Sequence, residues 1–82
     1  MDIILSKDAS KQYKRLLLSE QTKIHKRLTI LQQNPYEGKK LTGELEGVRS
    51  LRVWPYRILY EINEEKKIIE IHKIAHRQGV YK

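Results

Sequence analysis

The sequence VRSLRVWPYRILYEI, residues 48–62, alternates apolar and polar side chains on both sides of a Trp-Pro pair. A period of two is typical of β-strands, and Trp54-Pro55 supplies a turn between two of them. We therefore predict strands over 48–53 and 56–62, joined as an antiparallel hairpin. A further alternating run over 67–74 follows the polar turn 63–66 and predicts a third strand. Together these segments predict an antiparallel three-stranded meander.

The register of the hairpin follows from a two-residue turn at Trp54-Pro55. Val53 then pairs with Tyr56, and Arg52 pairs with Arg57. One face collects the apolar side chains and must be the core face. Its members are Leu51, Val53, Tyr56, Ile58, Tyr60 and Ile62. The opposite face carries Ser50, Arg52, Arg57, Leu59 and Glu61.

Two arginines directly opposite each other repel, which costs stability. An anion bound between Arg52 and Arg57 explains this arrangement. The alternative is a solvated sheet face on which screening makes the repulsion small. A two-residue turn at Glu64-Glu65 would also set His72 beside Arg57 on this face.

The first half of the sequence predicts a strand over 2–5 and then two helices. Ser6 is a suitable N-cap for the first helix, and Ser19 is the candidate cap for the second. Asn34-Pro35 ends the second helix, and 34–47 is predicted as a loop. The apolar positions of the two helices are Ala9, Tyr13, Leu16 and Leu17, then Ile24, Leu28 and Leu31. The fold class is therefore α+β: an N-terminal strand, an antiparallel helical hairpin and the meander, in the order β-α-α-β-β-β, as one domain over 1–82.

The composition narrows the function. The chain has 82 residues, with 17 Lys+Arg against 10 Asp+Glu, and a net charge of +7 that is spread along the whole sequence. A basic surface attracts polyanions, so nucleic acid or an acidic protein is the expected partner. The chain has no cysteine, which excludes disulfides and thiolate metal sites. No apolar run approaches membrane-spanning length and the N-terminus does not resemble a signal peptide, so we expect a cytoplasmic protein without a membrane partner.

Several short motifs together resemble the RelE/ParE toxin superfamily across essentially the whole chain. They are Asn34-Pro35, the run 40–43 (KLTG), Arg52-Val53, the run 56–60 (YRILY), the run 75–77 (AHR) and Val80-Tyr81. The resemblance implies a toxin of a type II toxin–antitoxin pair. RelE-like members of that superfamily enter the ribosomal A site and cleave mRNA, with the ribose 2′-hydroxyl attacking the adjacent phosphate. The implied partners are the ribosome, mRNA and an acidic antitoxin with an amphipathic helix; no metal or cofactor is required.

The resemblance also implies roles for individual residues. Arg52, Arg57 and Arg77 would stabilise the charge of the phosphate, because a guanidinium offers a bidentate fork. Tyr81 would stack on an mRNA base or orient a proton, and His76 would exchange protons near neutral pH. These five form the expected catalytic set. The expected RNA-binding residues are Lys39, Lys40, Arg49 and His72.

Each role has a simpler alternative. Arg77 could form a surface ion pair with Glu61 or Glu70, Tyr81 could pin the C-terminus by packing, and the histidines could be ordinary strand residues. Strict alternation places His72 and His76 on the face opposite Arg77, so a β-bulge is needed to bring Arg77 to Arg57.

Two departures from the superfamily pattern stand out. Trp54-Pro55 replaces a turn that commonly contains glycine, and Ser50 stands where ribosome-dependent members tend to have a basic side chain. Arginine is a poor general base, so the sequence identifies no base. Two other functions remain open: a ParE-like inhibitor of DNA gyrase, and a catalytically decayed domain that binds antitoxin or RNA.

Overall fold

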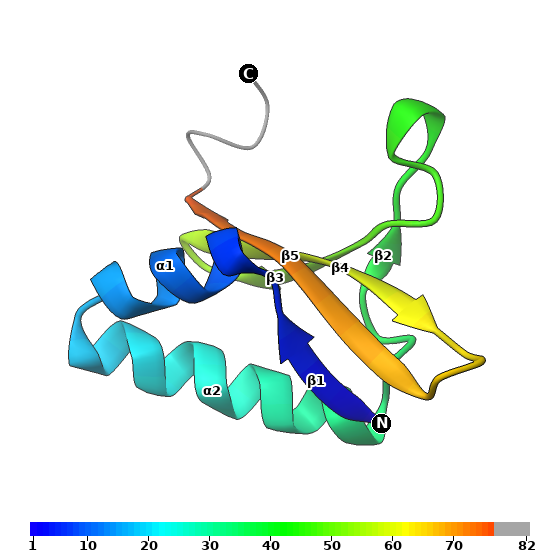
Figure 1. Ribbon diagram of the computed structural model, residues 1–82. Coiled ribbons are helices and arrows are strands. Elements are labelled where there is room, and N and C mark those ends of the chain that lie inside the picture. The colour runs from blue at the N-terminus through cyan, green and yellow to red at the C-terminus, as the bar shows by residue number, and fades with distance from the viewer. Residues whose placement is uncertain (77–82) are drawn as a thin grey trace.

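The computed structural model describes residues 1–76 and contains two helices on one side of a sheet (Figure 1). The elements are β1 (Asp2–Leu5), α1 (Lys7–Arg15), α2 (Leu18–Gln33), β2 (Lys39–Lys40), a 3₁₀ turn (Gly43–Leu45), β3 (Arg49–Val53), β4 (Tyr56–Asn63) and β5 (Ile68–His76). Neither helix has the length and apolar character needed to cross a membrane, among the residues described.

The five strands form one sheet in the order β1-β5-β4-β3-β2. β1 runs parallel to β5, and the other neighbours are antiparallel, so the sheet is mixed. Between the parallel strands β1 and β5 the chain passes through both helices and through strands β2, β3 and β4. The predicted α+β fold with the order β-α-α-β-β-β is confirmed. Strand β2 is an addition, because it lies inside the segment 34–47 that was predicted as a loop.

The helical hairpin begins as predicted. The Ser6 hydroxyl accepts the Ala9 backbone N–H at 3.0 Å and caps α1. The Gln21 side chain donates to the Tyr13 carbonyl at 2.9 Å and ties the two helices together. Helix α1 is shorter than its apolar spacing suggested, because it ends at Arg15.

Two predictions about the start of the second helix are wrong. Helix α2 begins at Leu18, so Ser19 lies inside the first turn and is not the N-cap. Leu17 occupies the cap position, and its backbone N–H donates to Glu20 Oε1 at 3.4 Å. The Leu17 side chain is 70% exposed and does not belong to an apolar helix face. Leu16, the other residue between the helices, does pack against the core.

The core lies between α2 and the helix-facing side of the sheet. From α2 it takes the three predicted positions, Ile24, Leu28 and Leu31. From β3 and β4 it takes the predicted apolar face: Leu51, Val53, Ile58 and Tyr60 are buried, and Tyr56 and Ile62 pack against them. Strand β5 contributes Ile69, Ile71 and Ile74.

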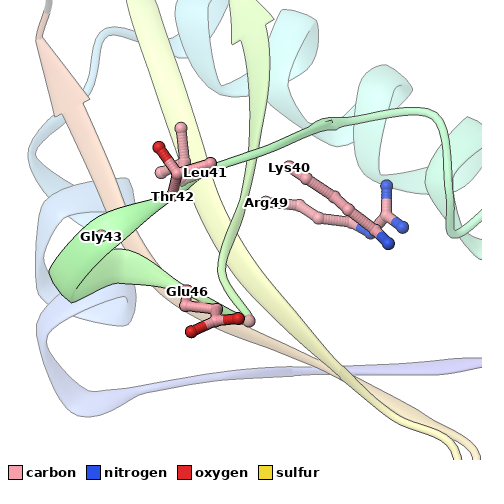
Figure 2. Close-up of a pocket in the computed structure, with 7 residues that line it drawn as sticks. Lys40, Leu41, Thr42, Gly43, Glu46 and Arg49 are labelled. Carbon is pink, nitrogen blue, oxygen red and sulfur yellow. The ribbon is translucent and has the colours of Figure 1, made fainter.

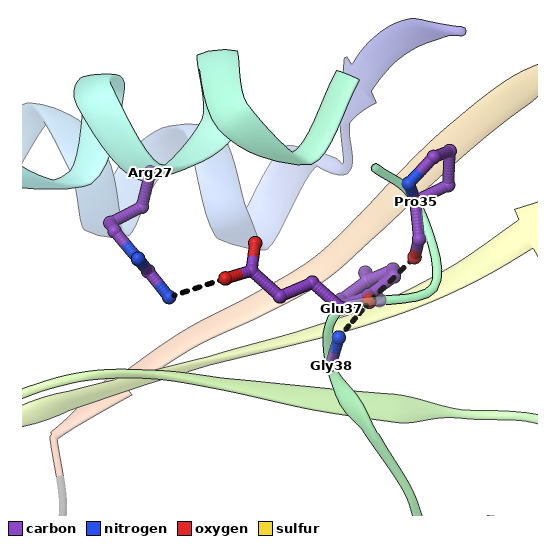
Figure 3. A network of polar contacts seen from close by, with 5 residues as sticks. Arg27, Pro35, Glu37 and Gly38 are labelled. Atoms are coloured by element: carbon purple, nitrogen blue, oxygen red, sulfur yellow. Dashed lines mark hydrogen bonds and ion pairs between the residues drawn. The ribbon is translucent and has the colours of Figure 1, made fainter. Parts of the chain in front are cut away.

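Tyr60 carries a polar group into this core and uses it to hold the segment after α2. Its ring is fully buried, and its hydroxyl donates to the Pro35 carbonyl at 2.8 Å and accepts the Gly38 N–H at 2.9 Å. A Cβ at Gly38 would lie 2.5 Å from the Tyr60 hydroxyl, so only glycine fits there. Figure 3 shows these contacts beside a contact of 3.4 Å between Arg27 and Glu37.

The β3–β4 hairpin has the predicted register. Val53 pairs with Tyr56 and Arg52 pairs with Arg57 across a two-residue turn with a cis Trp54–Pro55 peptide bond. Proline in this position is compatible with a tight turn that needs no glycine.

The predicted register of the next hairpin is wrong. Asn63 pairs with Ile68, so the turn between β4 and β5 has four residues, 64–67, instead of two. A bulge follows, since Leu59 pairs with Lys73 while Tyr60 pairs with Ile71, which leaves His72 as the extra residue. Arg57 therefore faces Ala75, and His72 does not lie beside it.

Candidate nucleic-acid interface

The sheet face away from the helices, called here the outer face, gathers cations at one end. Arg52 and Arg57 are directly opposite each other on β3 and β4. In the adjacent row, Ser50 pairs with Lys39 on one side and Leu59 on the other, and Leu59 pairs with Lys73. Side chains at these paired positions share one face of a pleated sheet. The cationic cluster therefore consists of Lys39, Arg52, Arg57 and Lys73.

Small side chains lie among these long cationic ones. Ser50 is two residues before Arg52 and Ala75 is opposite Arg57; they are 7% and 8% exposed. The Ser50 hydroxyl has no hydrogen-bond partner among residues 1–76. The cluster thus surrounds one hydroxyl whose hydrogen-bonding capacity the described part of the protein does not use.

The electrostatics of this arrangement favour an anion. Arg52 and Arg57 at directly opposed positions have their Cβ atoms about 5 Å apart. Their repulsion destabilises the hairpin unless solvent screens it or a negative group lies between them. A phosphate suits the position, because two guanidinium forks can donate to its oxygens at once.

The other end of the outer face is acidic. Glu61 pairs with Glu70, and His72 Nε2 lies 2.8 Å from Glu61 Oε1. A hollow of about 580 Å³ at this end is lined by four glutamates, Glu61, Glu64, Glu65 and Glu70, and by two cations of the sheet edge, Lys40 and Arg49. The face therefore has a cationic half next to the Trp54-Pro55 turn and an acidic half next to the turn 64–67. A polyanion that lies along the outer face is attracted by the cationic half and repelled by the acidic half.

His76 lies on the other side of the sheet from the arginine pair. It pairs with Tyr56, and the two rings meet edge to face with centroids 5.5 Å apart. The prediction that His72 and His76 share a face is wrong, because the bulge at His72 reverses the alternation. Burial and a hydrogen bond to Glu20 raise the pKa of Tyr56, so this phenol stays neutral at physiological pH.

Arg49, one of the expected RNA-binding residues, is engaged in holding the chain. It pairs with Tyr60, which puts it on the core side of β3. Its guanidinium donates to the Gly38 carbonyl at 2.8 Å and to the Tyr36 carbonyl at 3.3 Å, and lies 5.1 Å from the centre of the Tyr36 ring. Tyr36 in turn donates to Glu64, and this hydrogen bond raises the pKa of its hydroxyl.

Arg49 and Lys40 also line a pocket of about 500 Å³ at the sheet edge. Figure 2 shows the two cationic side chains extending together, with the Glu46 carboxylate pointing elsewhere. The remaining lining residues are Leu41, Thr42, Gly43 and Gly47. Because Lys40 and Arg49 pair on the core side, this pocket is separate from the cationic cluster.

The structure thus brings together Lys39, Arg52 and Arg57 from the expected set. It separates Lys40, Arg49 and His76 from them. Arg77 and Tyr81 lie outside the described residues, so their roles stay predictions. Lys73 is a member that sequence reasoning missed, because the bulge next to it hides its register. Within residues 1–76, no group of three or more histidines or carboxylates is arranged to hold a metal ion.

Comparison with known sequences finds relatives that are all described as toxins. A sequence model described as ParE toxin of type II toxin-antitoxin system, parDE, matches residues 3–81. The toxins RelE and RelG of Mycobacterium tuberculosis are each 40% identical, over 53 and 45 residues. These alignments cover 63% and 55% of this chain, and the chain spans about half the length of the two relatives, 55% and 52%.

Solved structures share the fold. The toxin–antitoxin complex RelBE2 of M. tuberculosis contains a chain with a TM-score of 0.85 and 27% identity, with 93% of this chain and 96% of that chain covered. The isolated RelE toxin of E. coli gives a TM-score of 0.80 at 19% identity, with 92% and 82% covered. A YoeB/ParE toxin from Agrobacterium tumefaciens gives 0.81 at 18% identity, with 93% and 98% covered. At these lower identities the likeness concerns the fold.

Proposed function

The chain belongs to the ParE toxin family of type II toxin–antitoxin systems, and on this premise we propose that it is a toxin that cleaves mRNA in the ribosomal A site. The observation that carries the proposal is the opposed pair Arg52–Arg57 on the outer face, within a cluster of four cations. The 40% identity to toxins named RelE and RelG supports the same direction.

The proposed reaction is an internal transesterification. The ribose 2′-oxygen forms a bond to the adjacent phosphorus, and the bond from phosphorus to the 5′-oxygen of the next nucleotide breaks. The 2′-hydroxyl proton leaves to a base, and the 5′-oxygen takes up a proton. The products are a 2′,3′-cyclic phosphate and a 5′-hydroxyl. No redox step or external co-reactant is needed.

Arg52 and Arg57 act on the charge that builds up on the phosphate. Donors already fixed around the pentacoordinate phosphate stabilise it more than they stabilise the ground state. Arginine stays protonated, so the pair serves as an electrostatic clamp and not as a base. Lys39 and Lys73, in the neighbouring row, hold adjacent phosphates of the same strand by charge.

Proton transfer falls to residues beyond the arginine pair. Arg57 and Glu61 are four residues apart on β4, roughly 13 Å, so the His72–Glu61 pair lies too far from a phosphate held at Arg57. We assign His72 to contact with a neighbouring nucleotide. Arg77 and Tyr81 follow β5 in sequence, and Ala75 at the end of β5 pairs with Arg57; these two residues are proposed to complete the catalytic set.

An antitoxin is the second proposed partner. The solved relatives include toxin–antitoxin complexes, among them RelBE2 of M. tuberculosis, RelBE of E. coli and YoeB-YefM of Staphylococcus aureus. We expect an acidic antitoxin segment with an amphipathic helix here, because the net charge of +7 leaves a basic surface for it to neutralise. A ribosomal target places the action in the cytoplasm.

A second candidate function is poisoning of DNA gyrase without nuclease activity. The matching family description names ParE, the gyrase-directed branch in the superfamily resemblance. The two functions are separated by one pair of assays. Purified protein is added to ribosomes programmed with a defined mRNA, and separately to gyrase with supercoiled DNA.

The expected result is A-site cleavage that leaves a 2′,3′-cyclic phosphate and a 5′-hydroxyl, without gyrase-linked DNA breaks. Intact mRNA together with gyrase-linked breaks would replace this proposal with the gyrase function. Intact mRNA and intact DNA, from protein that is folded and still binds its antitoxin, would indicate a catalytically decayed domain.

A further inference from the structure

A large aromatic side chain is exposed next to the cationic cluster. Trp54 is 57% exposed, and it lies two residues after Arg52 and three before Arg57. Leaving so much indole surface in water forgoes the stabilisation that its burial would provide. Trp54 directly follows Val53, the last residue of β3, and is the first residue of the turn.

The backbone around Trp54 is anchored from both sides. Val53, just before it, is only 6% exposed and packs in the core. Lys23 Nζ of α2 donates to the Trp54 carbonyl at 3.0 Å, and the Tyr56 hydroxyl donates to Glu20 Oε2 at 2.8 Å. The turn is therefore tied to helix α2, and the exposed indole sits on a supported backbone and not on a loose loop.

We propose that Trp54 is a base-stacking platform: it binds the face of one nucleobase of a single-stranded RNA whose phosphate lies at Arg52 and Arg57. This rests on the proposed function for the identity of the phosphate ligand. Trp54 is two residues from Arg52 along the chain, so their Cα atoms are at most about 7 Å apart, a reach that suits a phosphate and the base of its own nucleotide. Aromatic platforms next to a cationic groove are the usual means of holding single strands, because every base offers a π-face.

Other exposed apolar residues lie near this end of the molecule and suggest a protein partner instead. Leu17, just before α2, and Leu18, its first residue, are 70% and 79% exposed, and Glu20 in the first turn of α2 contacts Tyr56. An apolar protein segment brings no negative charge to the cations around Trp54, however, whereas a nucleotide brings a phosphate. Trp54 has Lys23 on its carbonyl and an arginine on each side in sequence. Its surroundings therefore match a nucleotide better than an apolar protein surface.

The test uses Trp54 itself, since it is the single tryptophan of the chain. Indole fluorescence is followed while a short 2′-O-methyl oligoadenylate is added, a probe that cannot undergo 2′-hydroxyl attack. The matched probe is an abasic oligomer of the same length and charge. We expect the oligoadenylate to quench the emission and the abasic oligomer to leave it nearly unchanged. Equal quenching by both probes would overturn the proposal.

Substitutions give a second readout, with binding measured by anisotropy of a labelled oligoadenylate. Trp54→Ala should weaken binding about 5- to 150-fold, and Trp54→Phe should lose less. Both should leave abasic binding unchanged, whereas Arg57→Ala should weaken both probes. Leu18→Ala is the matched apolar control and should bind like the wild type. Far-ultraviolet circular dichroism confirms that each variant is folded.

The outcomes separate this inference from the proposed function. Base-specific quenching with no A-site cleavage would leave the stacking site in place and remove the ribosomal nuclease. If the wild-type protein cleaves mRNA in the A site but Trp54→Ala binds the oligoadenylate as tightly as the wild type, the nuclease function stands and the stacking site is wrong. If Trp54→Ala and Leu18→Ala instead weaken binding of an acidic antitoxin and leave oligonucleotide binding intact, the exposed residues form a protein-docking surface and the stacking role is wrong.

Discussion

Arg49 and Arg52 lie three residues apart on β3 and show how differently the two faces of one strand use the same side chain. Arg49, on the core side, donates to the carbonyls of Gly38 and Tyr36 and lies against the Tyr36 ring. Arg52, on the outer face, is exposed and stands opposite another arginine. One guanidinium is used to position the chain, and the other is placed where an anion would relieve repulsion. Residue type alone does not distinguish them; the face of the strand does.

The largest expected contrast between the faces is in stability. Ile71→Ala on β5 removes a fully buried side chain, and we expect it to lower the free energy of unfolding by about 2–5 kcal/mol. Ile4→Ala on the neighbouring strand β1 is the control, because Ile4 is 52% exposed and should change this energy by less than about 0.5 kcal/mol. Urea unfolding followed by circular dichroism measures both. Similar losses for the two variants would mean that the outer face is covered.

Tyr60→Phe tests the polar contact inside the core. The change removes the hydroxyl that joins the Pro35 carbonyl and the Gly38 N–H, and should cost about 1–3 kcal/mol because both groups lose a buried partner. Burial raises the pKa of Tyr60 above its ordinary value of 10.0. Because the pKa of Tyr60 is higher in the folded state, its hydroxyl contributes its full stabilisation below about pH 10. This contribution is lost as the pH rises through the folded-state pKa.

The alkaline part of this prediction is measured by urea unfolding at increasing pH. Wild-type stability should decline above about pH 10, and Tyr60→Phe should decline less steeply. Some decline should remain in the variant, because burial also raises the pKa of Tyr56. Identical slopes for the two proteins would show that the Tyr60 hydroxyl does not titrate differently on folding.

The smallest expected effect on stability separates the two arginines of β3. Arg49→Ala should destabilise the fold by about 1 kcal/mol, since it removes two hydrogen bonds from a partly exposed cation. Arg52→Ala should change stability by less than about 0.5 kcal/mol. It should instead weaken binding of single-stranded RNA and reduce the slope of log K against log salt by about 0.7. A reversal of these two patterns would exchange the roles assigned to the residues.

The sequence predicted the fold where local chemistry and periodicity agree. The alternation of 48–62 placed the core face and the Arg52–Arg57 register correctly, and Ser6 was a correct cap. The prediction failed at the β4–β5 hairpin, where the length of the turn and the bulged residue His72 set the register. Nothing in the run 63–67 distinguishes a two-residue turn from a four-residue turn, and the bulge at His72 is visible only through the pairing of β4 with β5.

The part of the site that lies on the β3–β4 hairpin was predicted from the sequence, because the register of that hairpin was predicted correctly. Arg52 and Arg57 could be placed on one face, because β3 and β4 have a regular register. Lys39 was expected to bind RNA, but its place on this face comes from β2, which the sequence did not predict. Arg49 looked like another RNA-binding cation, since its carbonyl partners at Gly38 and Tyr36 depend on how the segment after α2 folds back. Lys73 was missed because its position depends on the bulge next to it.

The central claim is that the outer-face arginines act on the phosphate of mRNA. The direct measurement is the rate of A-site cleavage on programmed ribosomes for wild type, Arg57→Ala and the charge-matched control Arg15→Ala, which removes an exposed arginine of α1. We expect Arg57→Ala to cut roughly 100- to 1,000-fold more slowly while staying folded, and Arg15→Ala to remain close to wild type. Equal rates for all three proteins, or equal losses in the two variants, would contradict the account.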